Sequence, residues 1–199
     1  MTTRLIQLQR GNQKAVALVE EPQLRLLSRF DSVYTLAQAA IEAGGNLKQL
    51  LQRHLTEDRL DYNAIYEGRS DWKILVPIHH PVDSACTLVA GTGLTHTGSA
   101  MNRNAMHGSG STELSDSMKM FRLGLEGGRP EPGKIGVAPE WFYKGTGDIL
   151  RAHDEPLDVP PFADDGGDEA EVAGIYLIAP DGTPWRIGFT NGNGFSDHI

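Results

Sequence analysis

The chain has 199 residues, a net charge of −8 and no run of lysine or arginine. Its length allows one large or two small domains with a buried core, and its acidic balance argues against nucleic acid or an anionic membrane surface as the main partner. The 23 glycines and 11 prolines favour a turn-rich α+β or mostly β fold over a helical bundle. No apolar run reaches the roughly 18 residues of a membrane span and no signal peptide is visible, so we expect a soluble cytoplasmic protein.

Cys86 is the single cysteine, so it cannot form a disulfide within the chain. This favours a reducing compartment. Its neighbours Ala85, Leu88 and Val89 are apolar. We therefore expect Cys86 to be a small buried side chain and not a nucleophile.

Three short strands are predicted at the start of the chain, over residues 4–9, 14–20 and 23–27, because branched and apolar residues lie there between turn signals. Two helices follow. Apolar residues at helical spacing predict the first over residues 33–41, with Asp31 or Ser32 as its N-cap. Asn46 caps the second.

Residues 62–72 are polar and carry no clear pattern. We therefore predict a domain boundary there, with a small N-terminal α/β domain over residues 1–70 and a second domain over residues 71–199. An extended segment restarts at residue 73, and a buried strand is predicted over residues 87–90.

That strand runs into a loop, residues 91–99, which is rich in glycine and hydroxyl groups. Glycine lets a ligand approach the backbone, so the loop is a good place for a binding site. It lacks the Gly-Lys-Ser/Thr ending of a phosphate-binding loop. His96 and His107 are candidates for chemistry, with an ordinary hydrogen-bonded loop histidine as the alternative for each. The adjacent His79 and His80 are not expected to share a metal, because neighbouring side chains on a strand point apart.

An amphipathic helix is predicted over residues 114–125, and its methionines and Phe121 are expected to be core residues. Residues 139–144 then carry an aromatic run that ends in Lys144. This run indicates either a pocket wall or a strand edge with a solvated lysine.

Two carboxylates, Glu169 and Glu171, begin the strand predicted over residues 172–178. The two-residue period of a strand places both on one face. Like charges held side by side repel each other unless a cation or a proton neutralises them. A hard divalent cation with oxygen ligands is one solution, and a solvated acidic turn is the other. After a second strand, over residues 185–189, the chain ends in a Gly/Asn loop with no sign of a natural stop, so we expect a C-terminally truncated chain.

The order of these motifs resembles the fumarylacetoacetate hydrolase superfamily. The matching stretches are Gly93-Leu94-Thr95-His96, Phe142-Tyr143-Lys144, Glu169-Ala170-Glu171 and Gly188-Phe189-Thr190-Asn191-Gly192-Asn193. Each motif is weak alone, but their order and spacing over residues 73–199 are fairly specific. The runs at residues 91–96 and 119–124 are most similar to the branch of 2-keto-3-deoxyarabinonate-type dehydratases of sugar-acid catabolism.

The resemblance implies an α+β fold with a small N-terminal domain and a mixed β-roll core, incomplete at the C-terminus. It implies Mg²⁺, or Mn²⁺ or Ca²⁺, on Glu169, Glu171 and a third acid. The ion would hold a 2-keto acid and stabilise the enolate formed when a proton leaves C3. Lys144 and Thr95 would bind substrate, His96 and Ser99 are the candidate catalytic residues, and the family suggests a homodimer.

This chain departs from the family pattern at two places. The hydrolases activate water with a histidine and a glutamate where this chain has Ser99 and Asn102. A serine with no visible base cannot replace that pair, which favours dehydration over C–C hydrolysis. Gly194 stands where the family has its third acidic ligand, and nothing indicates that Asp197 substitutes for it.

We therefore predict a metal-dependent lyase that dehydrates 2-keto-3-deoxy sugar acids. A hydrolase that cleaves a C–C bond in a diketo acid is the alternative within enzymes. From another class, the chain is a degenerate ligand-binding homologue without catalysis. The expected partner is a small 2-keto acid, with neither nucleic acid nor membrane.

Overall fold

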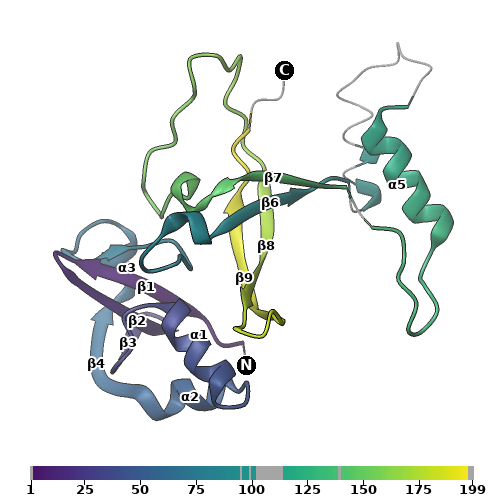
Figure 1. Cartoon of the computed structure of the whole chain (residues 1–199). Coiled ribbons are helices and arrows are strands. Elements are labelled where there is room, and N and C mark those ends of the chain that lie inside the picture. The colour runs from purple at the N-terminus through teal and green to yellow at the C-terminus, as the bar shows by residue number, and fades with distance from the viewer. Residues whose placement is uncertain (1, 95, 99, 102–113, 139, 197–199) are drawn as a thin grey trace. The chain divides into compact units, whose positions relative to one another are not determined.

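The computed structural model describes residues 2–94, 96–98, 100–101, 114–138 and 140–196 (Figure 1). The chain forms two compact units: unit 1 is Met1–Ser84 with Ile149–Ile199, and unit 2 is Ala85–Asp148. Both helices and strands are present, as the predicted α+β class requires. No helix among the described residues is long and apolar enough to cross a membrane. The division into domains at residue 70 stays a prediction.

Unit 1 contains an antiparallel sheet with the strand order β4-β3-β2-β1-β5. Its strands are β1 (Leu5–Arg10), β2 (Gln13–Glu20), β3 (Gln23–Leu27), β4 (Leu55–Asp61) and β5 (Lys73–Ile74). The first three confirm the predicted strands. β4 was not predicted, because its sequence is mostly charged. Edge strands tolerate charge. Partners come from the adjacent β3, where Arg25 pairs with Glu57 at 2.9 Å, and from β2, where Glu20 pairs with Arg59 at 2.7 Å.

Three helices accompany this sheet: α1 (Val33–Glu42), α2 (Leu47–His54) and the short α3 (Tyr62–Tyr66). The predicted caps are confirmed. The Ser32 hydroxyl accepts from the backbone N of Thr35 at 3.2 Å, and the Asn46 amide oxygen accepts from Gln49 N at 3.0 Å. Each bond satisfies an N–H group that the first turn of a helix leaves unpaired.

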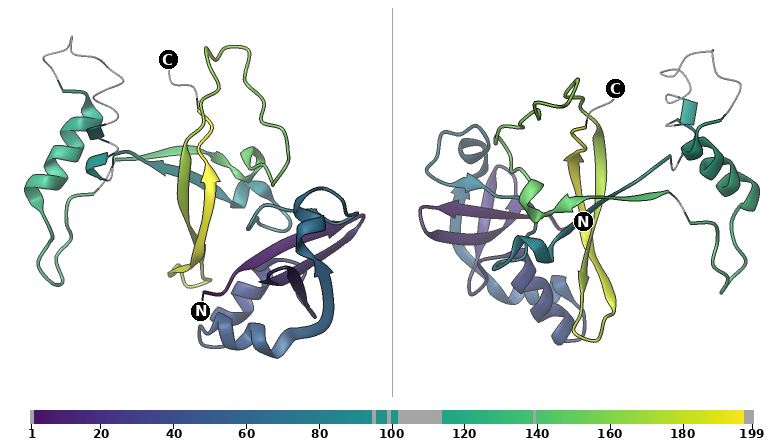
Figure 2. Two further views of the ribbon diagram at one scale, coloured as in Figure 1. Left: turned by 180° about the vertical axis from the view of Figure 1, so that it is seen from behind. Right: turned by 45° about the horizontal axis from the view of Figure 1, so that its top comes forward.

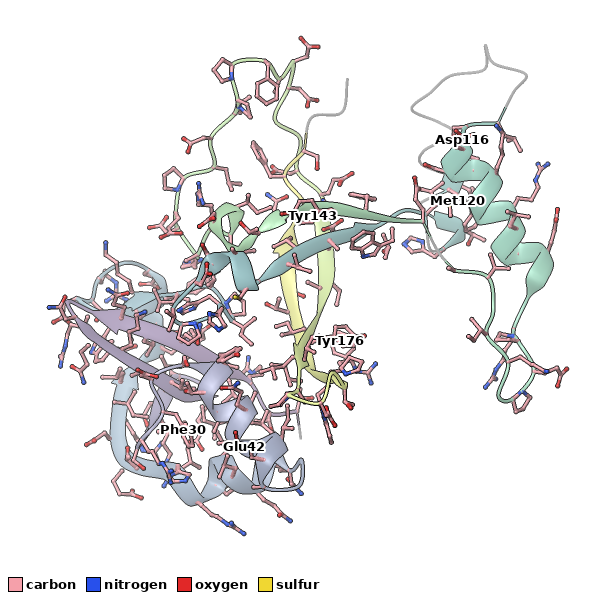
Figure 3. All side chains as sticks on the ribbon, viewed as in Figure 1. Phe30, Glu42, Asp116, Met120, Tyr143 and Tyr176 are labelled. Carbon is pink, nitrogen blue, oxygen red and sulfur yellow. The ribbon has the colours of Figure 1, made fainter. Side chains whose placement is uncertain are left out.

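The two faces of the sheet bury separate apolar clusters, as the alternation of side chains along a strand requires. On one face, strand residues pack against α1 and α2, and the buried members are Val16, Leu27, Phe30, Val33, Leu36 and Leu51. On the other face, the buried members are Leu8, Ala15, Ala17, Leu24, Ile65 of α3 and Trp72. Figure 3 labels Phe30 beside the helices. The core of unit 1 therefore lies on both sides of β1–β3.

A buried glutamine joins three segments of this region. Gln7 of β1 is fully buried. Its side-chain oxygen accepts from Val33 N at 2.7 Å, and its Nε2 donates to Val76 O at 2.7 Å and to His79 Nδ1 at 3.2 Å. Because every polar atom of this amide has a partner, its burial is compensated. Gln7 thus fixes the start of α1 and the segment after β5 on the sheet.

Unit 1 also contains the antiparallel hairpin of β8 (Ala170–Ile178) and β9 (Pro184–Asn193), shown from two further sides in Figure 2. The predicted turn is confirmed: Gly182 N donates to Ala179 O at 2.8 Å. Ile187 packs against the α1/α2 cluster, and Leu177 is buried. Much of the hairpin's remaining apolar surface is exposed, including Tyr176, which Figure 3 labels.

Unit 2 contains an antiparallel pair, β6 (Leu88–Thr92) with β7 (Trp141–Thr146), and the helix α5 (Asp116–Gly127), which Ser115 caps. Short 3₁₀ turns lie at Ser84–Cys86 and Gly147–Ile149. Three expectations were wrong. β6 lies where a buried strand was predicted, but three of its five residues are exposed. Cys86 is exposed, because it lies in the short 3₁₀ turn Ser84–Cys86, in which no residue is buried. None of the α5 residues is buried, so its apolar side chains are not core residues.

Candidate functional site

The two predicted carboxylates lie where β8 begins. Ala170 is the first residue of the strand, Glu171 is the second, and Glu169 immediately precedes it. Both glutamates are exposed. Because they are two residues apart on extended chain, their side chains share one face of the hairpin.

The backbone at this end of the hairpin is held by more than the strand ladder. Glu169 N donates to Asn193 Oδ1 at 3.0 Å, and Asn193 Nδ2 donates to Asp168 Oδ1 at 2.7 Å. Gly194 N donates to Glu169 O at 2.8 Å, and Gly167 and Ser196 form a further bridge. Both the N–H group and the carbonyl oxygen of Glu169 therefore form hydrogen bonds. Sequence reasoning did not identify the Asp168–Asn193 bond, since its partners are far apart in the chain.

The Cα–Cβ direction of Gly194 points at the Glu171 carboxylate. An ideal Cβ placed on Gly194 would be 2.7 Å from Glu171 Oε2 and 3.0 Å from Oε1. Non-bonded carbon and oxygen atoms do not approach so closely, so the observed carboxylate position depends on the absence of a side chain at residue 194. The residue is itself buried.

The donor set can be compared with the metal that the resemblance implies. Carboxylate oxygens are the right ligands for Mg²⁺, Mn²⁺ or Ca²⁺. Within the described residues, however, no group of three or more His, Cys, Asp or Glu side chains is arranged to hold a metal ion. Glu169 and Glu171 supply two carboxylates, and Gly194 supplies none. The residues present therefore do not form the three-acid site.

Lys144 lies on β7 in unit 2, opposite a glycine-containing stretch of β6. A Cβ on Gly91 would be 2.5 Å from Phe142 Cζ and 2.9 Å from Lys144 Cε, so glycine at residue 91 allows both side chains to lie across the strand. Lys144 Nζ is 5.7 Å from the centre of the Phe142 ring, which is within the range of a cation–π contact. The lysine is half-buried, whereas Trp141 and Tyr143 are exposed.

The other predicted residues of unit 2 belong to the loop after β6. His96 is exposed, and its carbonyl accepts from Ala100 N at 3.2 Å at the start of a helical turn. Thr95 and Ser99 lie outside the described residues, as do Asn102, His107 and Asp197. His96 and Lys144 belong to unit 2, whereas Glu169 and Glu171 belong to unit 1.

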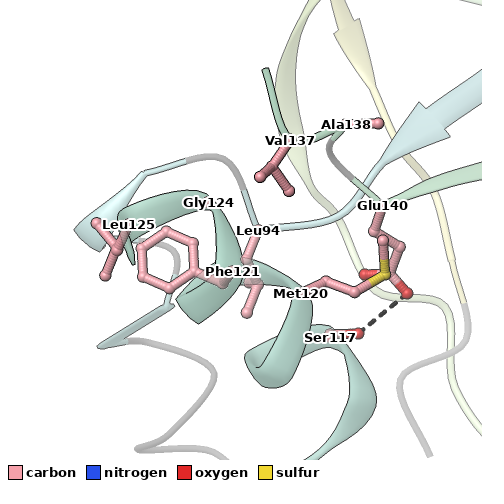
Figure 4. A pocket seen from close by; sticks show the side chains of 9 residues that line it. All are labelled: Leu94, Ser117, Met120, Phe121, Gly124, Leu125, Val137, Ala138 and Glu140. Carbon is pink, nitrogen blue, oxygen red and sulfur yellow. Dashed lines mark hydrogen bonds between the residues drawn. The ribbon is translucent and has the colours of Figure 1, made fainter. Parts of the chain in front are cut away.

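Unit 2 also has a pocket of about 400 Å³ beside α5 (Figure 4). It is lined by Leu94, Ser117, Met120, Phe121, Gly124, Leu125, Val137, Ala138 and Glu140. Glu140 accepts a hydrogen bond from Ser117 Oγ at 3.1 Å, and its carbonyl accepts from Gly93 N at 3.0 Å. A mostly apolar pocket whose charged lining residue is a carboxylate repels a small anion. It is therefore a poor site for a 2-keto acid. The sequence carried no signal for it, because Glu140 and Ser117 meet only in the fold.

No protein-family model matches the sequence, and no curated protein sequence matches it. A solved structure does match. It is that of a 2-keto-3-deoxyarabinonate dehydratase, with a TM-score of 0.56 and 16% sequence identity, and the match covers 97% of this chain. The chain spans 57% of the length of that dehydratase. The two proteins share a fold over this region, which is the fold expected from the order of the motifs.

Proposed function

We propose that this protein is a lyase that dehydrates 2-keto-3-deoxy sugar acids. The fold shared with a 2-keto-3-deoxyarabinonate dehydratase over 97% of the chain is the observation that supports it most. The order of the loop, the Phe-x-Lys segment and the Glu-x-Glu strand along the sequence supports the same proposal.

The proposed reaction removes water from the substrate. A base takes a proton from C3, which is acidic because the C2 carbonyl accepts the electron pair as an enolate. The enolate then expels the hydroxyl at C4, so that the sugar acid loses one molecule of water in total. From 2-keto-3-deoxyarabinonate this elimination gives 5-hydroxy-2-oxopent-3-enoate, which tautomerises to 2-oxoglutarate semialdehyde when one C5 proton and the C5 hydroxyl proton move to C3 and C4.

Lys144 is the residue whose described geometry fits a substrate-binding role. Its ammonium is held over Phe142 on a strand, and a lysine is a suitable partner for the substrate carboxylate. Thr95 as a second binding residue, and His96 and Ser99 as catalytic residues, are further parts of the proposal. So are Mg²⁺, Mn²⁺ or Ca²⁺ as the cofactor and a homodimer as the assembly. Light scattering after gel filtration tests the dimer.

The proposal is tested by incubating the full chain with 2-keto-3-deoxyarabinonate and Mg²⁺ and following the carbonyl signals by NMR. Appearance of 2-oxoglutarate semialdehyde is the expected result, and appearance of pyruvate would contradict dehydration.

The variant Lys144→Met should lower kcat/KM by about tenfold or more. Lys134→Met is the matched control, since Lys134 is an exposed lysine of a turn, and it should leave kcat/KM unchanged.

A second candidate, a ligand-binding homologue without catalysis, is favoured by one observation. Gly194 places no carboxylate beside Glu171. Binding of pyruvate or oxalate without turnover of 2-keto-3-deoxyarabinonate would support this candidate. The third alternative, a hydrolase of diketo acids, is disfavoured by Ser99 and Asn102, because neither side chain provides the base that activates water.

A further inference from the structure

The end of the β8–β9 hairpin brings four positions onto one face. Ala170 pairs with Asn193 and Glu171 with Gly192. Gly194 N donates to Glu169 O, so the next pair in the same register joins positions 169 and 194. Residues directly opposite each other in an antiparallel pair project to the same side. Positions 169, 171, 192 and 194 therefore share one face, with acids on one strand and glycines on the other.

The two glycines differ in what a side chain would meet. A Cβ on Gly192 meets no atom within 4 Å, whereas a Cβ on Gly194 would lie 2.7 Å from Glu171 Oε2. A side chain that starts from position 194 is therefore directed into the space that the Glu171 carboxylate occupies. A third acid at this position would bring its oxygens beside those of Glu171, within reach of an ion shared by both.

We infer that Gly194 leaves this acidic face one ligand short, and that a single carboxylate introduced at position 194 converts it into a divalent-cation site. The unmodified chain is therefore expected to bind Mg²⁺ more weakly than a Gly194→Glu variant. The inference rests on the proposed function in taking a divalent cation as the partner of Glu169 and Glu171. Affinity for hard cations rises with the number of charged oxygen ligands, so the third acid is the missing contribution.

The backbone at position 194 accepts a side chain. Gly194 is not among the glycines with a positive φ, so an L-residue is not strained there. The contact at 2.7 Å is with the far end of an exposed glutamate, which can rotate away. A bound cation would also remove the repulsion between the new carboxylate and Glu171.

The test is a calorimetric titration of the full chain with Mg²⁺ and, separately, Ca²⁺, in the absence of any substrate. Gly194→Glu is expected to lower the Kd for one of these ions by about tenfold or more relative to the unmodified chain. The gain should be lost in the double variant Gly194→Glu with Glu171→Gln, because the new acid then has no charged partner.

Two single variants control for size and for charge. Gly194→Gln adds nearly the same volume without a charge. Asn191→Glu adds the same charge on the opposite face, since Asn191 pairs with Val172 and is exposed. Neither should tighten cation binding. Circular dichroism verifies folding, and if Gly194→Glu does not fold, the shorter Gly194→Asp is titrated in its place.

Three results would overturn the inference: a gain for Gly194→Glu no larger than that for Asn191→Glu, a gain that survives the loss of Glu171, or an unmodified chain that already binds as tightly as Gly194→Glu. The titration contains no sugar acid, so its failure is distinct from failure of the proposed function. That function is contradicted only by the turnover experiment with 2-keto-3-deoxyarabinonate.

Discussion

The N-terminal sheet and the β8–β9 hairpin belong to the same unit but differ in how they are held. In the sheet, Leu8 and Leu24 are fully buried, and helices pack on one face. In the hairpin, Val172 is 73% exposed and Phe189 is 63% exposed. Apolar burial stabilises the first region, whereas the second depends largely on its own backbone ladder. The candidate acidic site thus lies on the element that contributes less to stability, an arrangement common for binding elements.

The largest expected effect follows from this contrast in burial. Leu24→Ala should lower the free energy of unfolding by about 2–5 kcal/mol, since it removes a fully buried side chain and leaves a cavity. Val172→Ala should change it by no more than about 0.5 kcal/mol. Urea unfolding followed by circular dichroism measures both. Similar losses for the two variants would show that the hairpin is as well packed as the sheet, and the comparison would fail.

A smaller effect is expected from the buried amide of the sheet region. Gln7→Met keeps the volume but leaves Val33 N and Val76 O without the bonds that Gln7 gives them. The expected cost is about 1–3 kcal/mol of unfolding free energy. Gln9→Met on the same strand is the control, because the Gln9 side chain makes a solvent-exposed bond to Gly11 O. Equal values for the two variants would mean that the buried bonds add no net stability.

The smallest expected effect is a dependence of folding stability on pH, which arises from His79 in the sheet region. Burial lowers the pKa of His79 below its usual value of 6.5, and the positive charge of Lys14 lowers it further. The unfolded state therefore binds the proton more readily. The stability that neutral His79 contributes is present above about pH 6.5 and is lost as the pH falls through the folded-state pKa.

Melting temperatures measured at several pH values between about 7.5 and 5 check this sign. His79→Gln should show a smaller loss on acidification than the unmodified chain. Lys14→Gln should lie between the two, because it removes only the second cause of the shift. An identical acid loss in all three proteins would exclude His79 as its source.

Local patterns in the sequence predicted most of the described strands and helices but missed β4 and α3. The strands β1–β3 follow from alternation, and α1 and α2 from Ser32 and Asn46 at their first turns. β4 was missed because it lacks the apolar alternation that predicts a strand. Its charged side chains form ion pairs with residues of β3 and β2. α3 has only five residues, Tyr62–Tyr66, after the N-cap Asp61, and is too short for a periodic signal.

The candidate site was predictable to the extent that its residues are close in sequence. The two-residue spacing of Glu169 and Glu171 predicted both at the start of one strand; Glu171 lies in β8 and Glu169 immediately precedes it. The exposed position of Cys86 and the Glu140–Ser117 bond were not predictable, because solvent access and contacts between distant residues arise only in the fold. The proximity of position 194 to Glu171 was not predictable either, because it depends on the register of β8 with β9.

The glycine beneath Glu171 has a consequence at the level of the gene. All glycine codons have guanine in the middle position, and replacing that base with adenine produces a codon for aspartate or glutamate whatever the third base is. A three-acid face and a two-acid face are therefore separated by a single nucleotide substitution. The contact at this position is with the movable end of an exposed side chain. A change between glycine and an acidic residue at position 194 therefore needs no other substitution in the hairpin.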